Sequence, residues 1–349
     1  MWYNFLAVFV FWASHALRIR KHSFFGKVIY MDIEYLLMLQ NLRNALGGTL
    51  DEFFNAVSKV SVGVMMVLPC VIFWCVDKKW GYRFLAVRWL GEVVNGLIKL
   101  TACVYRPWIR SELIEPAGDS KVAASGYSFP SGHTMCAVAT YGTAAVAQYK
   151  RRKWLSIVCG VMILLTMFSR NILGVHTPQD VIVGLLETVI LIILVLFASK
   201  RIDENDRRID LISLIGIALI IASLAYVLLK PYPMDYVNGV LLVDPKKMMK
   251  DTFNGCGGLL GLIIGSYIER HCIRYEIPTS HVYLPILTAV GAGIVYSWTE
   301  YFAGATVMLM FGRNWGNFAE GFVAVIFVTV LYPLIITKIC KNTEAKAAY

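Results

Sequence analysis

The chain has 349 residues, of which 58% are hydrophobic and only 16% are charged. This balance excludes an ordinary soluble enzyme, because it supplies far more apolar surface than one soluble core can bury. The formal net charge of +10 does not indicate nucleic-acid binding, since the basic residues are not gathered on one soluble face and no nucleic-acid motif accompanies them. The composition predicts an all-α, polytopic membrane protein.

Residues 1–55 are expected to form an interfacial, amphipathic lead-in. Its first 17 residues do not fit a secretory signal, because their basic residues follow the apolar run instead of preceding it. Three interpretations fit: an interfacial or extra helix, a signal anchor whose charges conflict with the topology below, or an upstream extension of a chain that naturally starts at Met31. We favour the third. The amphipathic stretch 31–54 is broken at Gly47 and Gly48 and is expected to lie along the membrane interface.

The rest of the chain contains repeated apolar windows of membrane-spanning length. They predict about nine transmembrane helices. By the positive-inside rule, the loops that carry most Lys and Arg residues, such as the block 150–153, are cytoplasmic, and the alternate loops are extracytoplasmic. The loop with Lys246, Lys247 and Lys250 is the exception, because it is basic but falls on the extracytoplasmic side. We interpret it as a surface that favours anionic lipid headgroups. The windows are 56–76, 85–105, 131–149, 154–171, 178–199, 211–229, 252–268, 283–311 and 318–340.

The second window carries Glu92, Asn95, Lys99 and Arg106, which share one helical face if the helix continues that far. Charged groups within a membrane span are costly and normally face the bundle interior or a wet cavity. In a simpler interpretation, Lys99 reaches the interface with its long side chain and Arg106 only flanks the span.

A polar turn, Gly-Tyr-Ser-Phe-Pro-Ser-Gly-His at 126–133, leads into the third window. Alone it indicates little, because Pro, Ser and Gly are common in loops and at helix starts. At a helix N-terminus, however, Ser131 and Gly132 offer a hydroxyl and backbone N–H groups to an anion. The preceding loop, Trp108 to Phe129, is either a lid that reads a headgroup or an ordinary loop.

Spans four and five enclose Ser169-Arg170, His176 and Asp180. Thr177 and Pro178 are a favourable cap and first-turn residue, so they predict the start of the fifth helix. His176 and Asp180 then lie one turn apart, where the carboxylate can hold one imidazole nitrogen protonated and leave the other with its lone pair. A purely structural His–Asp pair is the alternative. Glu187, Glu300 and Arg313 are expected to form structural pairs, and the eight cysteines to be packing residues without disulfides or zinc.

Set side by side, these three segments resemble the signature of the type 2 phosphatidic acid phosphatase superfamily. Its pattern is Lys, six residues, Arg-Pro; then Pro-Ser-Gly-His; then Ser-Arg, five residues, His, three residues, Asp. The chain matches every position, and the resemblance covers 56–199. It implies a phosphatase core of about five helices at 56–200 and a C-terminal four-helix membrane extension at 201–349. The expected topology is similar to that of glucose-6-phosphatase.

The resemblance also implies residue roles and a chemistry that uses neither metal nor cofactor. Lys99, Arg106 and Arg170 would hold the phosphate together with Ser131 and Gly132. His176 would attack phosphorus to form a phosphohistidine, and Asp180 would orient it. His133 would protonate the leaving alkoxide and later activate water.

The expected substrate is a lipid phosphate monoester or pyrophosphate of the phosphatidic acid, phosphatidylglycerophosphate or undecaprenyl pyrophosphate type. It would be hydrolysed at the extracytoplasmic face of the plasma membrane, with membrane lipids as partners and no nucleic acid. Three alternatives stay open: a phosphotransferase using the same intermediate, a soluble sugar-phosphate phosphatase, and a catalytically idle transporter or scaffold of the same fold.

Overall fold

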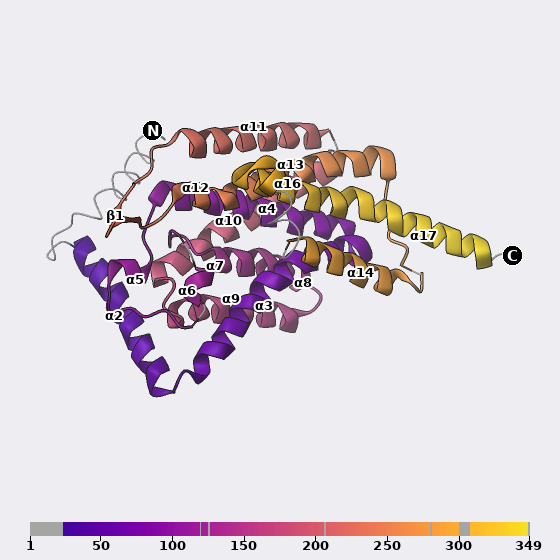
Figure 1. Ribbon diagram of the computed structural model, residues 1–349. Helices are drawn as coiled ribbons and strands as arrows, with labels where there is room; N and C mark the ends of the chain where they lie inside the picture. The colour runs from indigo at the N-terminus through magenta and orange to yellow at the C-terminus, as the bar shows by residue number, and fades with distance from the viewer. Residues whose placement is uncertain are drawn as a thin grey trace.

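The computed structural model describes residues 24–118, 120–124, 126–205, 207–279, 281–299 and 308–347. In these ranges the protein is a bundle of helices with one small antiparallel hairpin, β1 (Tyr236–Val237) paired with β2 (Val240–Leu241) (Figure 1). The prediction of an all-α membrane bundle is confirmed. Our expectations for residues 1–23 and for Glu300 lie outside the described residues.

Five helical segments of the described chain are long and apolar enough to cross a membrane. Helices lie in the other four predicted windows too, but these are shorter or more polar, so the count of nine spans stays a prediction. The five are Thr49–Val76, Lys153–Ile172, Pro178–Glu204, Arg208–Leu229 and Arg313–Lys341. The helices in the other windows are α4 (Lys78–Ala102), α7 (Gly132–Ala137) continued by η3 (Val138–Gly142) and α8 (Thr143–Gln148), α13 (Lys250–Ile268) and α14 (Leu284–Ser297).

The predicted break in the N-terminal lead-in is confirmed. Helix α2 (Phe24–Ala45) ends before Gly47 and Gly48, whose φ angles of 62° and 76° lie in the left-handed region that glycine adopts readily. Helix α3 (Thr49–Val71) starts directly after them and continues into η2 (Ile72–Val76). It therefore begins before residue 56, where we had expected the membrane core to start.

Helix α4 is central to the bundle because α3, α7, α10 (Pro178–Glu204) and α13 all pack against it. The Asp77 side chain caps its start by accepting from Trp80 N at 3.0 Å. It ends at Ala102, where Cys103 follows with a left-handed φ of 49°. The condition under which Arg106 would share a helical face with Lys99 is not met, because the helix ends before Arg106.

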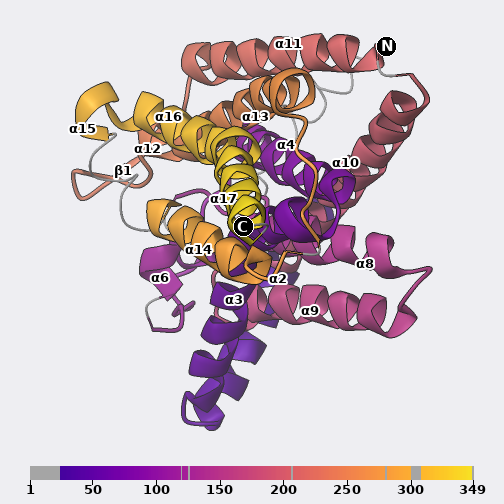
Figure 2. The same cartoon turned by 90° about the vertical axis from the view of Figure 1, so that its right-hand side faces the viewer.

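The C-terminal extension and the predicted phosphatase core share one hydrophobic core. A single buried cluster joins Trp74 and Val93 of the core to Cys256 and Val325 of the extension. Figures 1 and 2 show α13 lying against α4 and against α16 (Arg313–Ile326). Glycines make this approach possible: a Cβ on Gly258 would lie 2.1 Å from the Trp89 ring.

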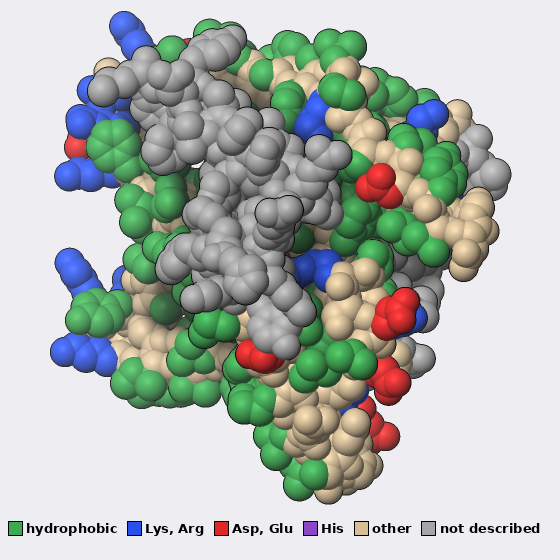
Figure 3. Space-filling view, turned by 90° about the vertical axis from the view of Figure 1, so that its left-hand side faces the viewer, with side chains coloured by type: hydrophobic (Ala, Val, Ile, Leu, Met, Phe, Trp, Pro, Cys, Tyr) green, Lys and Arg blue, Asp and Glu red, His purple; other side chains and the backbone are tan. Residues whose placement is uncertain are grey.

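Ion pairs join the helix ends that lie away from the polar turn 126–133. Lys79 and Arg83, at the start of α4, pair with Asp203 near the end of α10 at 2.6 and 3.2 Å. Lys78 pairs with Glu269 in η4 (Glu269–Ile273) at 2.9 Å. Figure 3 shows Lys and Arg side chains gathered along one edge of the molecule. This distribution is the one the positive-inside rule associates with a single membrane face.

The remaining helices are short or complete the long spans. All eight cysteines are free in the structure, and their expected role as packing residues stays a prediction. The other elements are α5 (Pro107–Arg110), α6 (Ser120–Ala123), α9 (Lys153–Ile172), α11 (Arg208–Leu229), α12 (Pro245–Met248), α15 (Met308–Phe311), η6 (Phe327–Leu331) and α17 (Tyr332–Ala347).

The contact between α13 and α16 predicts a stability effect. In Gly257→Ala the new Cβ would lie 1.9 Å from the Phe318 carbonyl oxygen, so the helices must separate, and we expect unfolding free energy to fall by about 1–3 kcal/mol. The measurement is thermal unfolding in detergent micelles. Gly160→Ala in α9 is the control, since its Cβ meets nothing within 4 Å. Equal midpoints for the two variants would show that this packing is not tight.

Candidate active site

The turn before α7 is fixed to the start of α10. Ser131 caps α7, its Oγ accepting hydrogen bonds from Thr134 N at 3.4 Å and Thr134 Oγ1 at 3.1 Å. Its own N–H donates to the Asp180 carbonyl at 2.9 Å. Gly184 allows this approach, because a Cβ there would lie 2.8 Å from the Ser131 carbonyl oxygen. The segments that carry His133 and Asp180 are thus held against each other.

Lys99 reaches this turn from α4. A Cβ added to Gly132 would lie 3.7 Å from the Lys99 Nζ, so the ammonium group stands directly beside the turn. The lysine is buried, with 8% of its surface exposed. Its Nζ lies 3.8 Å from the Asp251 carboxylate of α13, so the interpretation in which Lys99 only reaches to the membrane interface does not fit.

Arg106 lies in extended backbone after α4 and connects three segments of the site. Its buried guanidinium donates from Nη1 to the Val175 carbonyl at 2.9 Å and from Nε to the Gly126 carbonyl at 3.3 Å. The same Nη1 lies 2.8 Å from His176 Nε2. Arg106 is therefore a site residue in this structure and more than a flank of the span.

Arg170, in the last turn of α9, is a buried cation whose hydrogen-bonding capacity is only partly used. It is 2% exposed, and its Nη1 donates to Ser58 Oγ at 2.6 Å. Its Nε and Nη2 are buried and have no hydrogen-bond partner among the described residues. A buried guanidinium with unused donors is costly, and a phosphate oxygen is the acceptor that its fork fits best.

His176 is oriented by the capped start of α10, as the sequence predicts. Thr177 and Asp180 form a capping box, in which Asp180 Oδ2 accepts from Thr177 N at 2.9 Å. The same oxygen lies 3.3 Å from His176 Nδ1 and accepts a hydrogen bond from Ser128 Oγ. Asn171 holds the His176 carbonyl at 2.9 Å. This network assigns the proton to Nδ1 and the lone pair to Nε2.

The electrostatic surroundings keep the His176 ring neutral. Burial, together with the Arg106 cation, lowers the pKa of His176 to about 3, against the opposing effect of Asp180. Burial also lowers the pKa of Arg106, to about 10, which leaves that guanidinium charged at neutral pH. A neutral imidazole with a free lone pair is the nucleophilic form of histidine.

His133 is the second residue of α7 and is half-buried. Within the described part of the chain its imidazole makes no hydrogen bond, so both ring nitrogens are available to a ligand. Its role stays a prediction. The same ranges contain no cluster of three or more His, Cys, Asp or Glu residues able to hold a metal ion.

Sequence reasoning missed three side chains that support the predicted site: Ser58, Ser128 and Asn171. Ser128 lies in the quoted turn, but nothing in its spacing shows that it bonds Asp180. Ser58 comes from α3, which carries no signature residue. Asn171 directly follows Ser169-Arg170 of the signature, and this position was the only feature of the sequence that could have pointed to it.

The described part of the loop Trp108 to Phe129, which omits residues 119 and 125, is held against α2 by side-chain contacts. Arg110 pairs with Asp32 of α2 at 2.9 Å. Arg43 of α2 donates to the Glu115 carbonyl at 2.7 Å. Tyr127, which we had included in a lid that reads a headgroup, is fully buried. These contacts favour a loop that is held in place over a movable lid.

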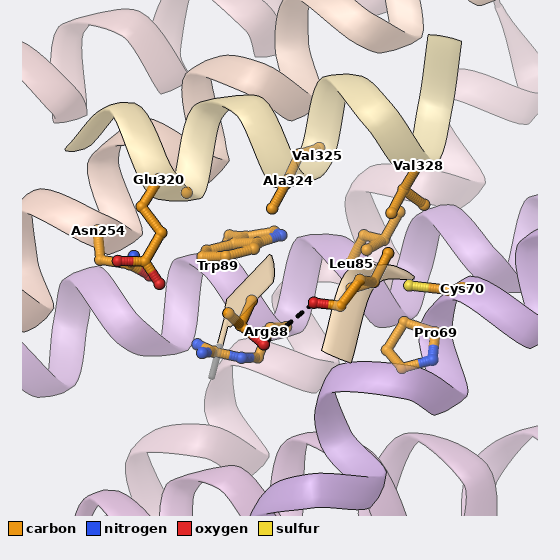
Figure 4. A pocket seen from close by; sticks show the side chains of 13 residues that line it. Pro69, Cys70, Leu85, Arg88, Trp89, Asn254, Glu320, Ala324, Val325 and Val328 are labelled. Atoms are coloured by element: carbon orange, nitrogen blue, oxygen red, sulfur yellow. Dashed lines mark hydrogen bonds between the residues drawn. The ribbon is translucent and has the colours of Figure 1, made fainter. Parts of the chain in front are cut away.

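A separate, small cavity of about 60 Å³ lies inside the bundle, and no signature residue lines it. Figure 4 shows Trp89 and Arg88 of α4 facing Glu320 of α16, with Asn254 beside the Glu320 carboxylate. Arg88 also pairs with Glu92 on its own helix. The polar residue Glu92 of the second window thus serves this interior pair and not the phosphate site.

The environment of His176 predicts its protonation state. Folding lowers the pKa of His176 from 6.5 to about 3. Between these two pH values His176 is protonated in the unfolded chain but neutral in the folded protein. The contribution of His176 to the free energy of unfolding therefore falls as the pH falls through this range. In ¹⁵N-histidine NMR of the empty protein, the ring should stay neutral and Nδ1-protonated at roughly pH 5. The resonance that disappears in the His176→Asn variant is assigned to His176. A titration midpoint near the ordinary histidine value would contradict the assignment.

Comparisons with known proteins agree with the geometry. Residues 80–204 match the PAP2 superfamily. Phosphatidylglycerophosphatase B of Bacillus subtilis is 35% identical over 138 residues, which are 37% of this chain and 65% of that protein, so the match spans less than two thirds of its length. Sphingosine-1-phosphate phosphatase 2 of Mus musculus is 24% identical over 271 residues, covering 74% of this chain and 70% of the relative.

No solved structure matches the chain. Every residue of the predicted catalytic and phosphate-binding set, from Lys99 to Asp180, lies inside the matched range 80–204. Both relatives just described carry the names of enzymes that act on lipid phosphates. The segment 80–204, which contains the whole signature, is thus similar to the PAP2 superfamily.

Proposed function

We propose that the protein is a metal-independent membrane phosphatase that hydrolyses a lipid phosphate monoester or pyrophosphate through a phosphohistidine at His176. The observation that carries this proposal is a neutral, oriented imidazole beside buried cations whose donors are not all used. The superfamily match and the names of both relatives support the activity. The relatives' names add sphingosine-1-phosphate to phosphatidylglycerophosphate among the candidate substrates, and phosphatidic acid and undecaprenyl pyrophosphate fit the same chemistry.

Phosphate binding would rearrange one contact of the site. Arg106 Nη1 lies 2.8 Å from His176 Nε2 and so covers the lone pair that must attack. A phosphate oxygen is a stronger acceptor for the guanidinium than a neutral imidazole. We infer that the substrate draws Arg106 onto its oxygens, which frees Nε2, while Lys99, Arg170 and the Ser131–Gly132 turn hold the remaining oxygens.

The chemistry then proceeds in two displacements. Nε2 of His176 attacks phosphorus, the bond from phosphorus to the ester oxygen breaks, and protonated His133 gives its proton to the leaving oxygen. Asp180 stabilises the positive charge that develops on His176 through Nδ1–H. A water molecule next gives its proton to His133 and attacks phosphorus, and the P–N bond breaks with return of the electron pair to Nε2.

The location of the site favours a lipid over a soluble phosphate. Its residues come from the ends of α4 and α9 and the start of α10, and α9 and α10 are long enough to cross a membrane. Helix ends of this kind meet lipid headgroups. With the basic ends of α4 and α10 assigned to the cytoplasm, the site would face the extracytoplasmic side of the plasma membrane.

Three other functions are separated by experiment. A phosphotransferase would use the same phosphohistidine and pass the phosphoryl group to another hydroxyl in place of water. A soluble sugar phosphate would need no lipid surface. An idle transporter or scaffold is disfavoured because His133, His176 and Asp180 are all present.

The first test is turnover by purified protein with a panel of lipid phosphates and one sugar phosphate, in the presence of EDTA. His176→Asn should lower kcat by about a thousandfold or more, because the nucleophile is removed. His133→Ala should slow poor leaving groups most. Wild-type turnover by His176→Asn would contradict the nucleophile, loss of activity in EDTA would contradict metal independence, and a preference for the sugar phosphate would contradict the lipid assignment.

A second test concerns the anion site itself. Arg170→Gln should weaken binding of vanadate, a phosphate mimic, by about 10- to 100-fold, because a charge-assisted contact is lost. Inhibition by vanadate gives the affinity. Arg201→Gln, on an exposed arginine near the far end of α10, is the matched control and should bind vanadate as the wild type does. Unchanged affinity in Arg170→Gln would remove this arginine from the anion site.

A further inference from the structure

One residue of the C-terminal extension reaches the phosphate-binding lysine. Asp251, in the first turn of α13, places its Oδ2 3.8 Å from Lys99 Nζ. Close packing fixes it there, since a Cβ on Gly96 of α4 would lie 2.3 Å from the neighbouring Thr252 Oγ1. Asp251 lies outside residues 80–204, which match the superfamily. The extension therefore contributes a carboxylate to a site that is otherwise built by the core.

The Asp251 carboxylate is available to a ligand. Its side chain is 34% exposed, against 10% for that of Lys99. Among the described residues it makes no hydrogen bond, and its contact with Lys99 is longer than one. Its charge is felt more widely in the site, because Asp251 acts with Asp180 to raise the pKa of Arg106 against the larger effect of burial.

A carboxylate at this position opposes the proposed function unless something compensates it. A phosphate monoester carries up to two negative charges at neutral pH, and the Asp251 charge repels it while competing for Lys99. A substrate that carries its own cation close to the phosphate removes this conflict. The cation takes the place of Lys99 at Asp251, and Lys99 is released to the phosphate.

We propose, on the basis of the proposed function, that Asp251 selects lipid phosphates with a protonated amine on the carbon next to the one that bears the phosphate. This requirement follows from the short distance between Asp251 and Lys99. The ammonium group that binds Asp251 and the phosphate that binds Lys99 must be equally close to each other in the substrate. Sphingoid-base phosphates have this arrangement, whereas glycerol-based monoesters place an ester or hydroxyl there. Asp251 is thus a specificity residue and not part of the phosphoryl-transfer machinery.

The test compares sphingosine-1-phosphate with its N-acetyl derivative, which differs in the loss of the amine charge. Wild-type kcat/KM should favour the free amine by about tenfold, the scale of one charge-assisted hydrogen bond. In Asp251→Asn this preference should disappear through a loss on the amine substrate alone, and Asp251→Glu should restore part of it. Asp210→Asn, on an exposed carboxylate in the first turn of α11, should keep the wild-type preference.

The ratio of the two kcat/KM values is the readout, because it does not depend on the fraction of each variant that is folded. Should Asp251→Asn fail to fold, Asp251→Ser is measured by the same ratio. An equal loss on both substrates would make Asp251 a positioning residue for Lys99 and overturn the proposal, as would a wild type that prefers the N-acetyl lipid or phosphatidic acid. A wild type that hydrolyses no lipid phosphate would instead overturn the proposed function.

Discussion

The cost of burying positive charge is the constraint on which the site depends. Lys99, Arg106 and Arg170 are all buried, and burying a cation is expensive unless partners compensate it. Arg106 has carbonyls and a neutral imidazole, and Arg170 has one serine hydroxyl and two unused donors. These cations are therefore under-compensated by the protein alone, and under the proposed function a phosphate would supply the missing acceptors. The affinity for the anion would then come from relieving the cost of burying these charges.

A single helix start orients the reactive parts. Asp180 satisfies the backbone of the α10 cap, holds His176 Nδ1–H and accepts from Ser128, while its carbonyl receives the Ser131 N–H. Because one carboxylate takes part in local folding and in aligning the imidazole, His176 can be placed without a separate scaffold. The same sharing means that an Asp180 substitution would damage the cap and the site together, so the two effects cannot be assigned from that residue alone.

The sequence predicts the parts of the site that follow local rules. Thr177-Pro178 as a helix start, and His176 one turn before Asp180, need only helix geometry and capping preferences. The end of α4 was not predictable, because the left-handed turn at Cys103 is uncommon for a non-glycine residue and has no sequence signal. Contacts between distant segments, such as Ser58 with Arg170, depend on helix packing that periodicity does not encode. The polar faces of α4 and α7 likewise obscure the number of spans.

The core and the C-terminal extension meet at the contact between Lys99 and Asp251, and the two parts have different roles in the proposed function. The core supplies every residue of the signature, and the superfamily match ends where α10 ends. The extension shares the hydrophobic core with α4 and cannot be a loosely attached module. A helix that packs against Lys99, the proposed phosphate-binding lysine, can change which lipid is accepted and leave the phosphoryl chemistry intact, because it touches the edge of the proposed site and not the reacting atoms. Substrate choice in this chain would then reside mainly outside the signature, in the residues that α13 presents beside Lys99.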